Sequence, residues 1–381
     1  MKSLLSPAPS NRRRASAFTL VEMLVVVTII IILVLIAVPA FQAMIYSNGR
    51  IQAEEGLKAG LALGRDAAVR GGDGEDAAAV FIYEPGSGIK IIACRRVGSI
   101  EDIDLNRTGP ERFVQRDVFV PISTFEPVSL PRIWTVRGYA GSGQIDAGWY
   151  EESGGSPRYP IGEPSWVFPE TGFFDADLNN SAADGLNRQT FMVRFAGGTG
   201  SVTTASPDAA LVVYPRDSRF NRVAGISPDL RLDTSKDKVR TARRIMADRI
   251  SITSEDQRRQ LLGEVSGDCL LVKSVTQLAL MDETKLASAL GVRVSPVTGC
   301  IYEASKRPEF VVRNGSGSEP AVTAERINRW VQGDTNLDGI YRAGRDQTNP
   351  TDEPIAKIFV LDRFLGSVQQ VVLQPAPGYI P

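Results

Sequence analysis

The chain has 381 residues, with 43 Lys and Arg against 44 Asp and Glu, so its formal net charge at pH 7 is −1. This balance leaves no basic stripe, and we expect no nucleic-acid partner. The chain has no histidine, which excludes Ser-His-Asp and Cys-His nucleophilic sites and all histidine metal ligation. We therefore expect a protein that is not an enzyme.

The N-terminus combines a basic leader with a long apolar segment. Residues 1–17 hold four basic side chains and no acid. From Met23 to Phe41, only Thr28 has a side chain with a hydrogen-bonding group. As an α-helix this segment would span ~30 Å, the hydrocarbon thickness of a bilayer, and the basic leader should stay cytoplasmic. Glu22 stands where the apolar run begins; a carboxylate there is costly and marks a function.

The string FTLVE, residues 18–22, resembles the class III signal of type IV pilins and type II secretion pseudopilins. The resemblance implies that prepilin peptidase cuts between Ala17 and Phe18 and that Phe18 is then methylated. Glu22 corresponds to the family's glutamate, which neutralises the N-terminal amine of a neighbouring subunit during filament assembly. Pro39 matches the family's helix-kinking proline. The implied location is the bacterial inner membrane, with one span and a periplasmic body, before assembly with other pilin or pseudopilin subunits.

An ordinary signal anchor or secretory signal is the alternative reading of this segment. Val38-Pro39-Ala40 would then supply a small-residue cleavage site after the apolar core.

Beyond the apolar run, the sequence predicts that the helix of residues 18–70 continues past its membrane-spanning part at about 20–41. The glycine-rich stretch after Arg70 should end it. Gly56, Gly60 and Gly64 recur every fourth residue, and each costs ~1 kcal/mol relative to Ala in a helix interior. They indicate either close approach of another backbone, from the body's own sheet or a neighbouring helix, or a loosely specified helix.

Residues 71–215 predict a β-rich body. Two strands at 77–83 and 88–95, joined by a Pro-Gly turn, form a hairpin after the helix. This order resembles H-type minor pseudopilins and FimT-like pilins, which implies an α+β fold with the long helix packed on an antiparallel sheet. Further strands are expected at residues 112–120, 132–139, 190–195 and 210–214.

Residues 216–381 are expected to form a large C-terminal extension that the resemblance does not describe. Here the sequence predicts a strand at 270–275, a short helix at 282–290, and a final hairpin of strands 355–361 and 368–373.

One loop of this extension has the spacing of a Ca²⁺ site. Asp334, Asn336 and Asp338 supply oxygens at positions 1, 3 and 5, a glycine follows, and Ile340 would offer a carbonyl at position 7. Position 12, which should be acidic, is Arg345. The alternative is an Asx-rich turn without an ion.

The three cysteines, Cys94, Cys269 and Cys300, permit one disulfide, which we would place between Cys269 and Cys300. Three buried thiols are the alternative. The whole pattern favours a filament subunit, most like a minor pseudopilin. A binding protein or adhesin displayed on the same anchor remains the alternative, and an anchored periplasmic enzyme a third.

Overall fold

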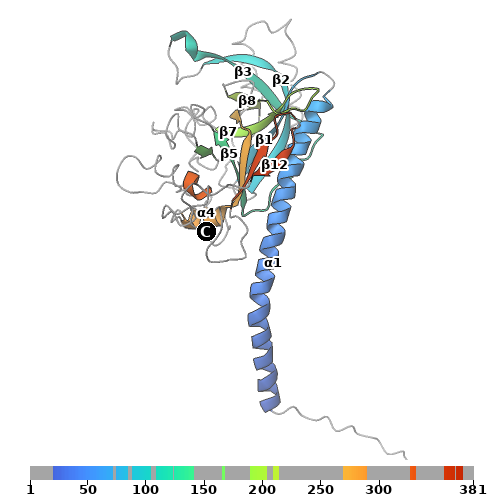
Figure 1. Ribbon diagram of the computed structural model, residues 1–381, viewed down its shortest axis with the longest axis vertical. Helices are drawn as coiled ribbons and strands as arrows, with labels where there is room; N and C mark the ends of the chain where they lie inside the picture. The colour runs from blue at the N-terminus through green and yellow to red at the C-terminus, as the bar shows by residue number, and fades with distance from the viewer. Residues whose placement is uncertain are drawn as a thin grey trace, which may run out of the picture. The chain divides into compact units, whose positions relative to one another are not determined.

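The computed structural model describes residues 20–71, 74–84, 88–103, 109–122, 124–140, 165–167, 189–203, 209–213, 269–289, 327–331, 356–364 and 366–371. The chain divides into two compact units, residues 1–50 and residues 51–381. Figure 1 shows a long helix and a β-rich body, so the predicted α+β class is confirmed.

Helix α1 runs without interruption from Leu20 to Val69, which confirms the predicted helix to within one residue at its described end. The backbone amide of Arg70 still donates to the Asp66 carbonyl (2.9 Å), and Gly71 follows outside the helix. Pro39 and the sequence Ser47-Asn48-Gly49 lie inside α1 and do not end it.

Six strands close into a barrel next to the helix. They are β1 (Ala77–Glu84), β2 (Gly88–Ile103), β3 (Phe113–Pro121), β7 (Gln189–Phe195), β8 (Ala210–Val213) and β9 (Cys269–Ser274). The hydrogen-bonded order is β1-β7-β9-β8-β3-β2, and β2 pairs back to β1. The short strand β4 (Val128–Ser129) adds to β2, and a 3₁₀ turn, Gly109–Arg112, precedes β3.

Two pairs of neighbouring strands in this barrel run parallel: β3 with β8, and β7 with β9. The expectation of an antiparallel sheet is therefore only partly right. Parallel neighbours need a long connection between them, and here long stretches of chain separate β3 from β8 and β7 from β9.

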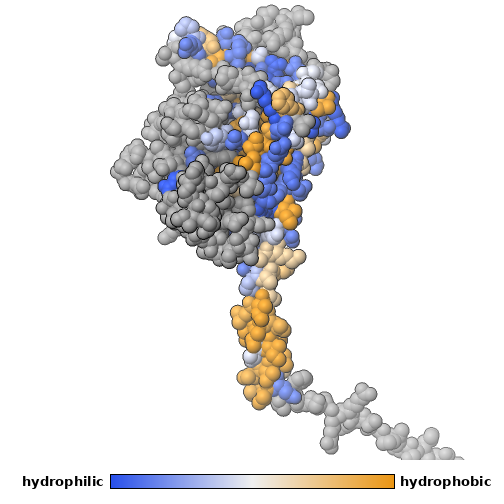
Figure 2. Space-filling view, viewed as in Figure 1, coloured by the Kyte–Doolittle hydropathy of each residue, from blue (hydrophilic) through white to orange (hydrophobic). Residues whose placement is uncertain are grey.

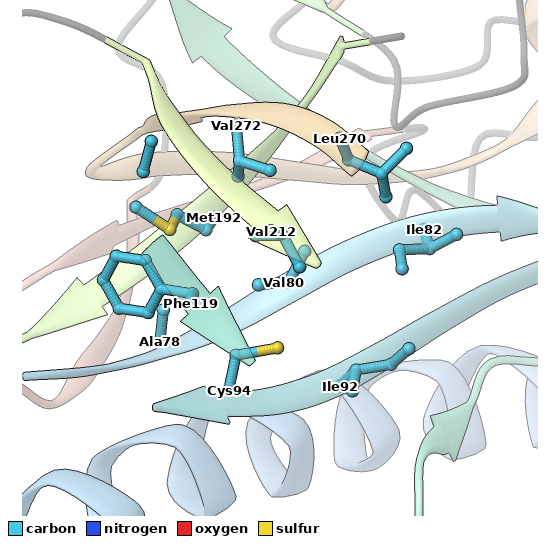
Figure 3. Packing of buried hydrophobic residues seen from close by; sticks show 11 residues of the cluster. Ala78, Val80, Ile82, Ile92, Cys94, Phe119, Met192, Val212, Leu270 and Val272 are labelled. Carbon is cyan, nitrogen blue, oxygen red and sulfur yellow. The ribbon is translucent and has the colours of Figure 1, made fainter. Parts of the chain in front are cut away.

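The inside of the barrel is a hydrophobic cluster to which all six strands contribute (Figure 3). Successive side chains of a strand point to opposite faces, so every second residue of a strand enters it. The buried members are Ala78, Val80, Ile82, Ile92, Cys94, Phe119, Met192, Ala210, Val212, Leu270 and Val272. Cys94 thus acts as a small apolar group.

A second sheet has the order β12-β11-β10-β5-β6. Its strands are β5 (Trp134–Ala140), β6 (Ser165–Val167), β10 (Gln277–Asp282), β11 (Ala356–Leu361) and β12 (Val368–Val371). It packs closely on the barrel, because a Cβ on Gly138 would meet the Phe191 ring at 2.7 Å. Phe191 in turn stacks on Phe81, with ring centroids 4.9 Å apart.

The C-terminal part of the chain is built into both sheets. β9 lies between β7 and β8 in the barrel, and β10 pairs with β5. The boundary expected near residue 215 therefore does not coincide with a boundary between sheets. A short helix, α4 (Glu283–Ala289), follows β10. Asp282 caps it by accepting from the backbone amide of Thr284 (2.8 Å).

Candidate assembly site

The first half of α1 is apolar on every side. Its large side chains from Leu20 to Ile45 are each between 45% and 81% exposed within the single chain. On the face that Figure 2 shows, this half of the helix is covered almost entirely by apolar side chains. In the part of the chain that the structure describes, α1 is the helix long and apolar enough to cross a membrane. So large an apolar surface requires a cover of lipid or of other protein.

Between Met23 and Phe41, Thr28 is the one residue with a polar side chain. Its Oγ1 donates to the Leu24 carbonyl one turn earlier (2.8 Å). The hydroxyl is thus satisfied by its own helix, which is how a polar side chain is tolerated where water is absent.

Glu22 lies in the first turn of α1 and is exposed. It is the only charged side chain between Leu20 and Arg50. A carboxylate in a first turn faces the unpaired amides of the helix N-terminus, whose partial positive charge stabilises it. The site therefore presents a negative charge at the end of an apolar rod.

Pro39 sits in the middle of α1 with helix on both sides. Proline has no amide hydrogen, so the carbonyl one turn earlier, that of Leu35, lacks its usual helical donor.

Several predicted site residues lie outside the described residues. They are the cleavage and methylation residues Ala17 and Phe18, and the proposed calcium ligands Asp334, Asn336, Asp338 and Ile340. Cys300 and the side chain of Cys269 are also outside. Within the described ranges, no group of three or more Cys, Asp or Glu side chains is arranged to hold a metal ion.

The body carries a charge network that was not predicted from the sequence. Arg194 of β7 bridges Asp76 (Nη2 to Oδ2, 2.6 Å) and Asp117 of β3 (Nη1 to Oδ2, 2.7 Å). Arg96 of β2 bridges the same Asp117 (2.8 Å) and Glu75 (2.7 Å). Burial alone would lower the pKa of Arg96, but the hydrogen bonds and the charge attraction of Asp117 and Glu75 together outweigh burial and raise it.

This network joins strands that are distant in sequence. Asp76 also accepts the amide of Gly197 (3.0 Å), and the guanidinium of Arg194 lies 5.3 Å from the centre of the Phe119 ring. Each of the three carboxylates in the network, those of Glu75, Asp76 and Asp117, is paired with an arginine. The network therefore stabilises the barrel. Only the alternation of charged and apolar residues on β3 and β7 could have signalled it.

A second charged group is buried at the start of α4. Glu283 and Asp282 are each 2% exposed and Arg137 of β5 is fully buried. Burial raises the pKa of Glu283 to about 8; Arg137 opposes the rise and Asp282 adds to it.

The glycines of α1 prove to be contact points with the body's own strands. A Cβ on Gly56 would lie 2.9 Å from Leu130, and one on Gly64 would lie 2.8 Å from the backbone nitrogen of Ala79. The predicted close approach is confirmed, and its partner is the sheet. Glu54 of the same helix forms an ion pair with Lys357 of β11.

Comparison with known proteins adds one finding. The family model of the prokaryotic N-terminal methylation motif matches residues 12–38. No curated protein and no solved structure matches the chain. The chain therefore carries a prepilin signal of the type IV pilin and pseudopilin type, and such a signal implies processing by prepilin peptidase.

Proposed function

We propose that this protein is a subunit, and more specifically a minor pseudopilin, of a type II secretion pseudopilus or a type IV pilus-type filament. The observation that carries the proposal is the exposed apolar half of α1, which overlaps the match to the prepilin methylation motif at residues 12–38. Its length of 381 residues supports a minor role. The proposed role is assembly and not catalysis.

Before assembly, the apolar half of α1 lies in the inner membrane. The basic leader keeps the N-terminus cytoplasmic, which directs the body to the periplasm. In this state lipid covers the side chains that the isolated chain leaves exposed.

During assembly, the same half-helix leaves the lipid and enters a bundle of equivalent helices. Apolar contacts alone would change little, since lipid tails are as apolar as the bundle. A charge pair would make the transfer from lipid into the bundle favourable. Cleavage before Phe18 creates a new N-terminal amine, and Glu22 of an adjoining subunit neutralises it in the apolar bundle. A charge left without this counter-ion would be costly there.

N-terminal mass spectrometry of the mature protein tests this proposal. We expect a chain that starts at N-methyl-Phe18 when the host contains prepilin peptidase, and an uncut leader when the peptidase gene is deleted. A mature chain that starts near Phe41 would instead show an ordinary secretory signal and would overturn the proposal.

The alternative, an anchored binding protein or adhesin, predicts a different effect of replacing Glu22. An anchor needs only the apolar helix, so replacement of Glu22 would leave surface display unchanged. A filament subunit would lose incorporation.

A further inference from the structure

Strand β12 (Val368–Val371) lies at one edge of the second sheet. In the described part of the chain it pairs with β11 alone. Gln369 and Gln370 are exposed, and Val371 is 39% exposed. Edge strands are commonly guarded against a further strand by a charged side chain, a proline or a bulge, and β12 contains none of these. This edge is therefore open to an added strand.

The pairing of β11 with β12 shows which backbone groups face the open side. The Leu361 amide donates to the Thr276 carbonyl (3.0 Å), on the side of β11 that lies away from β12. Leu361 and its partner Val368 are therefore a pair without mutual hydrogen bonds, and such pairs alternate with bonded pairs along an antiparallel ladder. It follows that Val368 and Gln370 turn their amides and carbonyls toward the open side.

The turn that leads into β12 carries an exposed aromatic ring. Phe364 is 85% exposed, more than any other large apolar side chain in the described residues after Arg50. Its amide donates to Asp362 Oδ1 (2.8 Å). The Asp362 amide donates to the Ser367 carbonyl (2.8 Å), and the Gly366 amide to the Asp362 carbonyl (2.9 Å). Because the turn is already ordered, less conformational entropy is lost when a partner covers the ring.

Two arginines place positive charge beside the same turn. Arg363 belongs to the turn, and Arg65 of α1 reaches it, since a Cβ on Gly366 would lie 3.3 Å from Arg65 Cδ. Both arginines are exposed. Within the described ranges neither forms an ion pair, whereas the nearby Arg70 is bound to Asp66 (2.6 Å). A strand that adds to β12 is therefore favoured when it carries carboxylates at the end beside this turn.

A second copy of this chain does not meet that requirement. Two β12 strands paired in parallel would bring like arginines together. Paired antiparallel, the basic turn of each copy would meet the residues that follow Val371 in the other, and residues 372–381 contain no acid. The partner that the charges fit is a different protein.

We propose that β12 accepts an extended segment of a different protein as an added antiparallel strand, and that this segment is acidic where it meets Arg65 and Arg363. Backbone hydrogen bonds to Val368 and Gln370 supply affinity, and the two charges select the partner. Antiparallel pairing is the more stable kind and places the carboxyl-terminal end of the segment beside the turn. The inference goes beyond the proposed function, since the edge accepts such a strand whether or not the protein enters a filament.

A peptide probe, added to the full chain in detergent, tests the charge requirement. The probe is an acetylated peptide of alternating Val and Thr, about eight residues long, with two Asp at its carboxyl-terminal end. The control peptide has Lys in place of both Asp. Fluorescence anisotropy should show about tenfold tighter binding of the Asp peptide, and Arg363→Glu should remove this preference. No binding of the Asp peptide, or equal affinity for the two peptides, would refute the proposal.

A matched pair of variants separates backbone pairing from charge attraction. Gln370→Pro removes an amide on the open side of β12, where proline is tolerated because the ladder with β11 keeps its hydrogen bonds. Gln370→Thr keeps that amide. Both variants should unfold at nearly the same temperature as wild type, and the proline variant should bind the Asp peptide about tenfold more weakly than the threonine variant. Equal binding by the two variants would exclude strand addition.

Hydrogen exchange of the wild-type chain gives a reading that needs no variant. The bound Asp peptide should slow exchange in Val368–Val371 and leave β3 unchanged, because the added strand protects only amides at the open edge. A peptide that binds without slowing exchange in β12 would contradict the proposal. A mature chain that starts near Phe41 would overturn the proposed function and leave this binding unaffected.

Discussion

Gly60 of α1 lies directly on Ile91 of β2: a Cβ added to the glycine would come within 2.7 Å of the isoleucine side chain. The contact has no room for a larger residue. We therefore predict that Gly60→Leu overpacks the interface between helix and barrel and destabilises the body by ~1–3 kcal/mol. Thermal unfolding in detergent would measure this. Ala62→Leu, on the exposed side of the same helix, is the control and should change stability by less than ~0.5 kcal/mol.

The charge network on the barrel gives a second prediction. Arg194→Met removes a side chain that is 6% exposed and that neutralises Asp76 and Asp117. Because two carboxylates lose a partner, we expect a loss of ~3–5 kcal/mol in the free energy of unfolding, measured in urea. Arg70→Met breaks only an exposed pair within α1 and should cost less than ~1 kcal/mol. Equal losses in the two variants would contradict the structural role assigned to Arg194.

The pKa of Glu283 predicts a pH dependence of stability. Burial raises this pKa from 4.5 to about 8, so between these values the folded protein holds a proton that the unfolded chain releases. The contribution of Glu283 to the free energy of unfolding therefore falls as pH rises from 4.5 to 8.

The matching variant is Glu283→Gln, which stays neutral at every pH. Urea unfolding at pH 5, 6, 7 and 8 should show a smaller decline for this variant than for wild type, by an amount on the order of 5 kcal/mol across the window. Parallel curves for the two proteins would show that the carboxyl is ionised throughout.

Glu22 provides a test of assembly that is separate from folding. We predict that Glu22→Ala leaves membrane insertion and leader cleavage intact and reduces incorporation into filaments by at least tenfold, since the amine of the adjoining subunit loses its counter-ion. Membrane fractionation and immunoblots of sheared filaments would measure the two effects. Glu22→Asp keeps the charge and should retain more incorporation than Glu22→Ala. Normal incorporation of the alanine variant would refute the mechanism.

The placement of β9 predicts that the body does not divide near residue 215. A chain that ends there lacks β9, and β7 and β8 would each lose a hydrogen-bonded neighbour. We expect that this truncated protein unfolds without a cooperative transition, and that residues 216–381 alone do not fold. A folded, monomeric fragment 216–381 would contradict the shared barrel and would favour an independent binding domain.

Local features of the fold could be predicted from the sequence. The apolar run predicted α1, and short apolar runs predicted β1, β7 and β11 to within a few residues. Strand β2 begins where it was predicted but continues to Ile103, well past the predicted end at residue 95. The hairpin turns were also evident from their Pro and Gly residues. Helices, strands and turns of this kind are set by residues close together in the chain, so the sequence pattern shows them directly.

The pairing of distant strands could not be predicted in the same way. Nothing near Leu270 or Val272 indicates that β9 enters between β7 and β8, because parallel neighbours are selected by packing in the barrel interior. Strand β10 was missed for a related reason: Gln277–Asp282 is mostly apolar and does not alternate, since both faces are buried. The partners of Arg194 follow from the same long-range pairing.

The closed barrel has a consequence for how the protein reaches its final location. In the proposed export, with the N-terminal helix held in the membrane, β1 would arrive long before β9. During that interval the half-built wall exposes strand edges that are open to wrong partners. If the body is exported as proposed, we expect the half-built barrel to depend on periplasmic chaperones until Ser274 has crossed, because β9 is the last barrel strand along the chain and closes the barrel between β7 and β8.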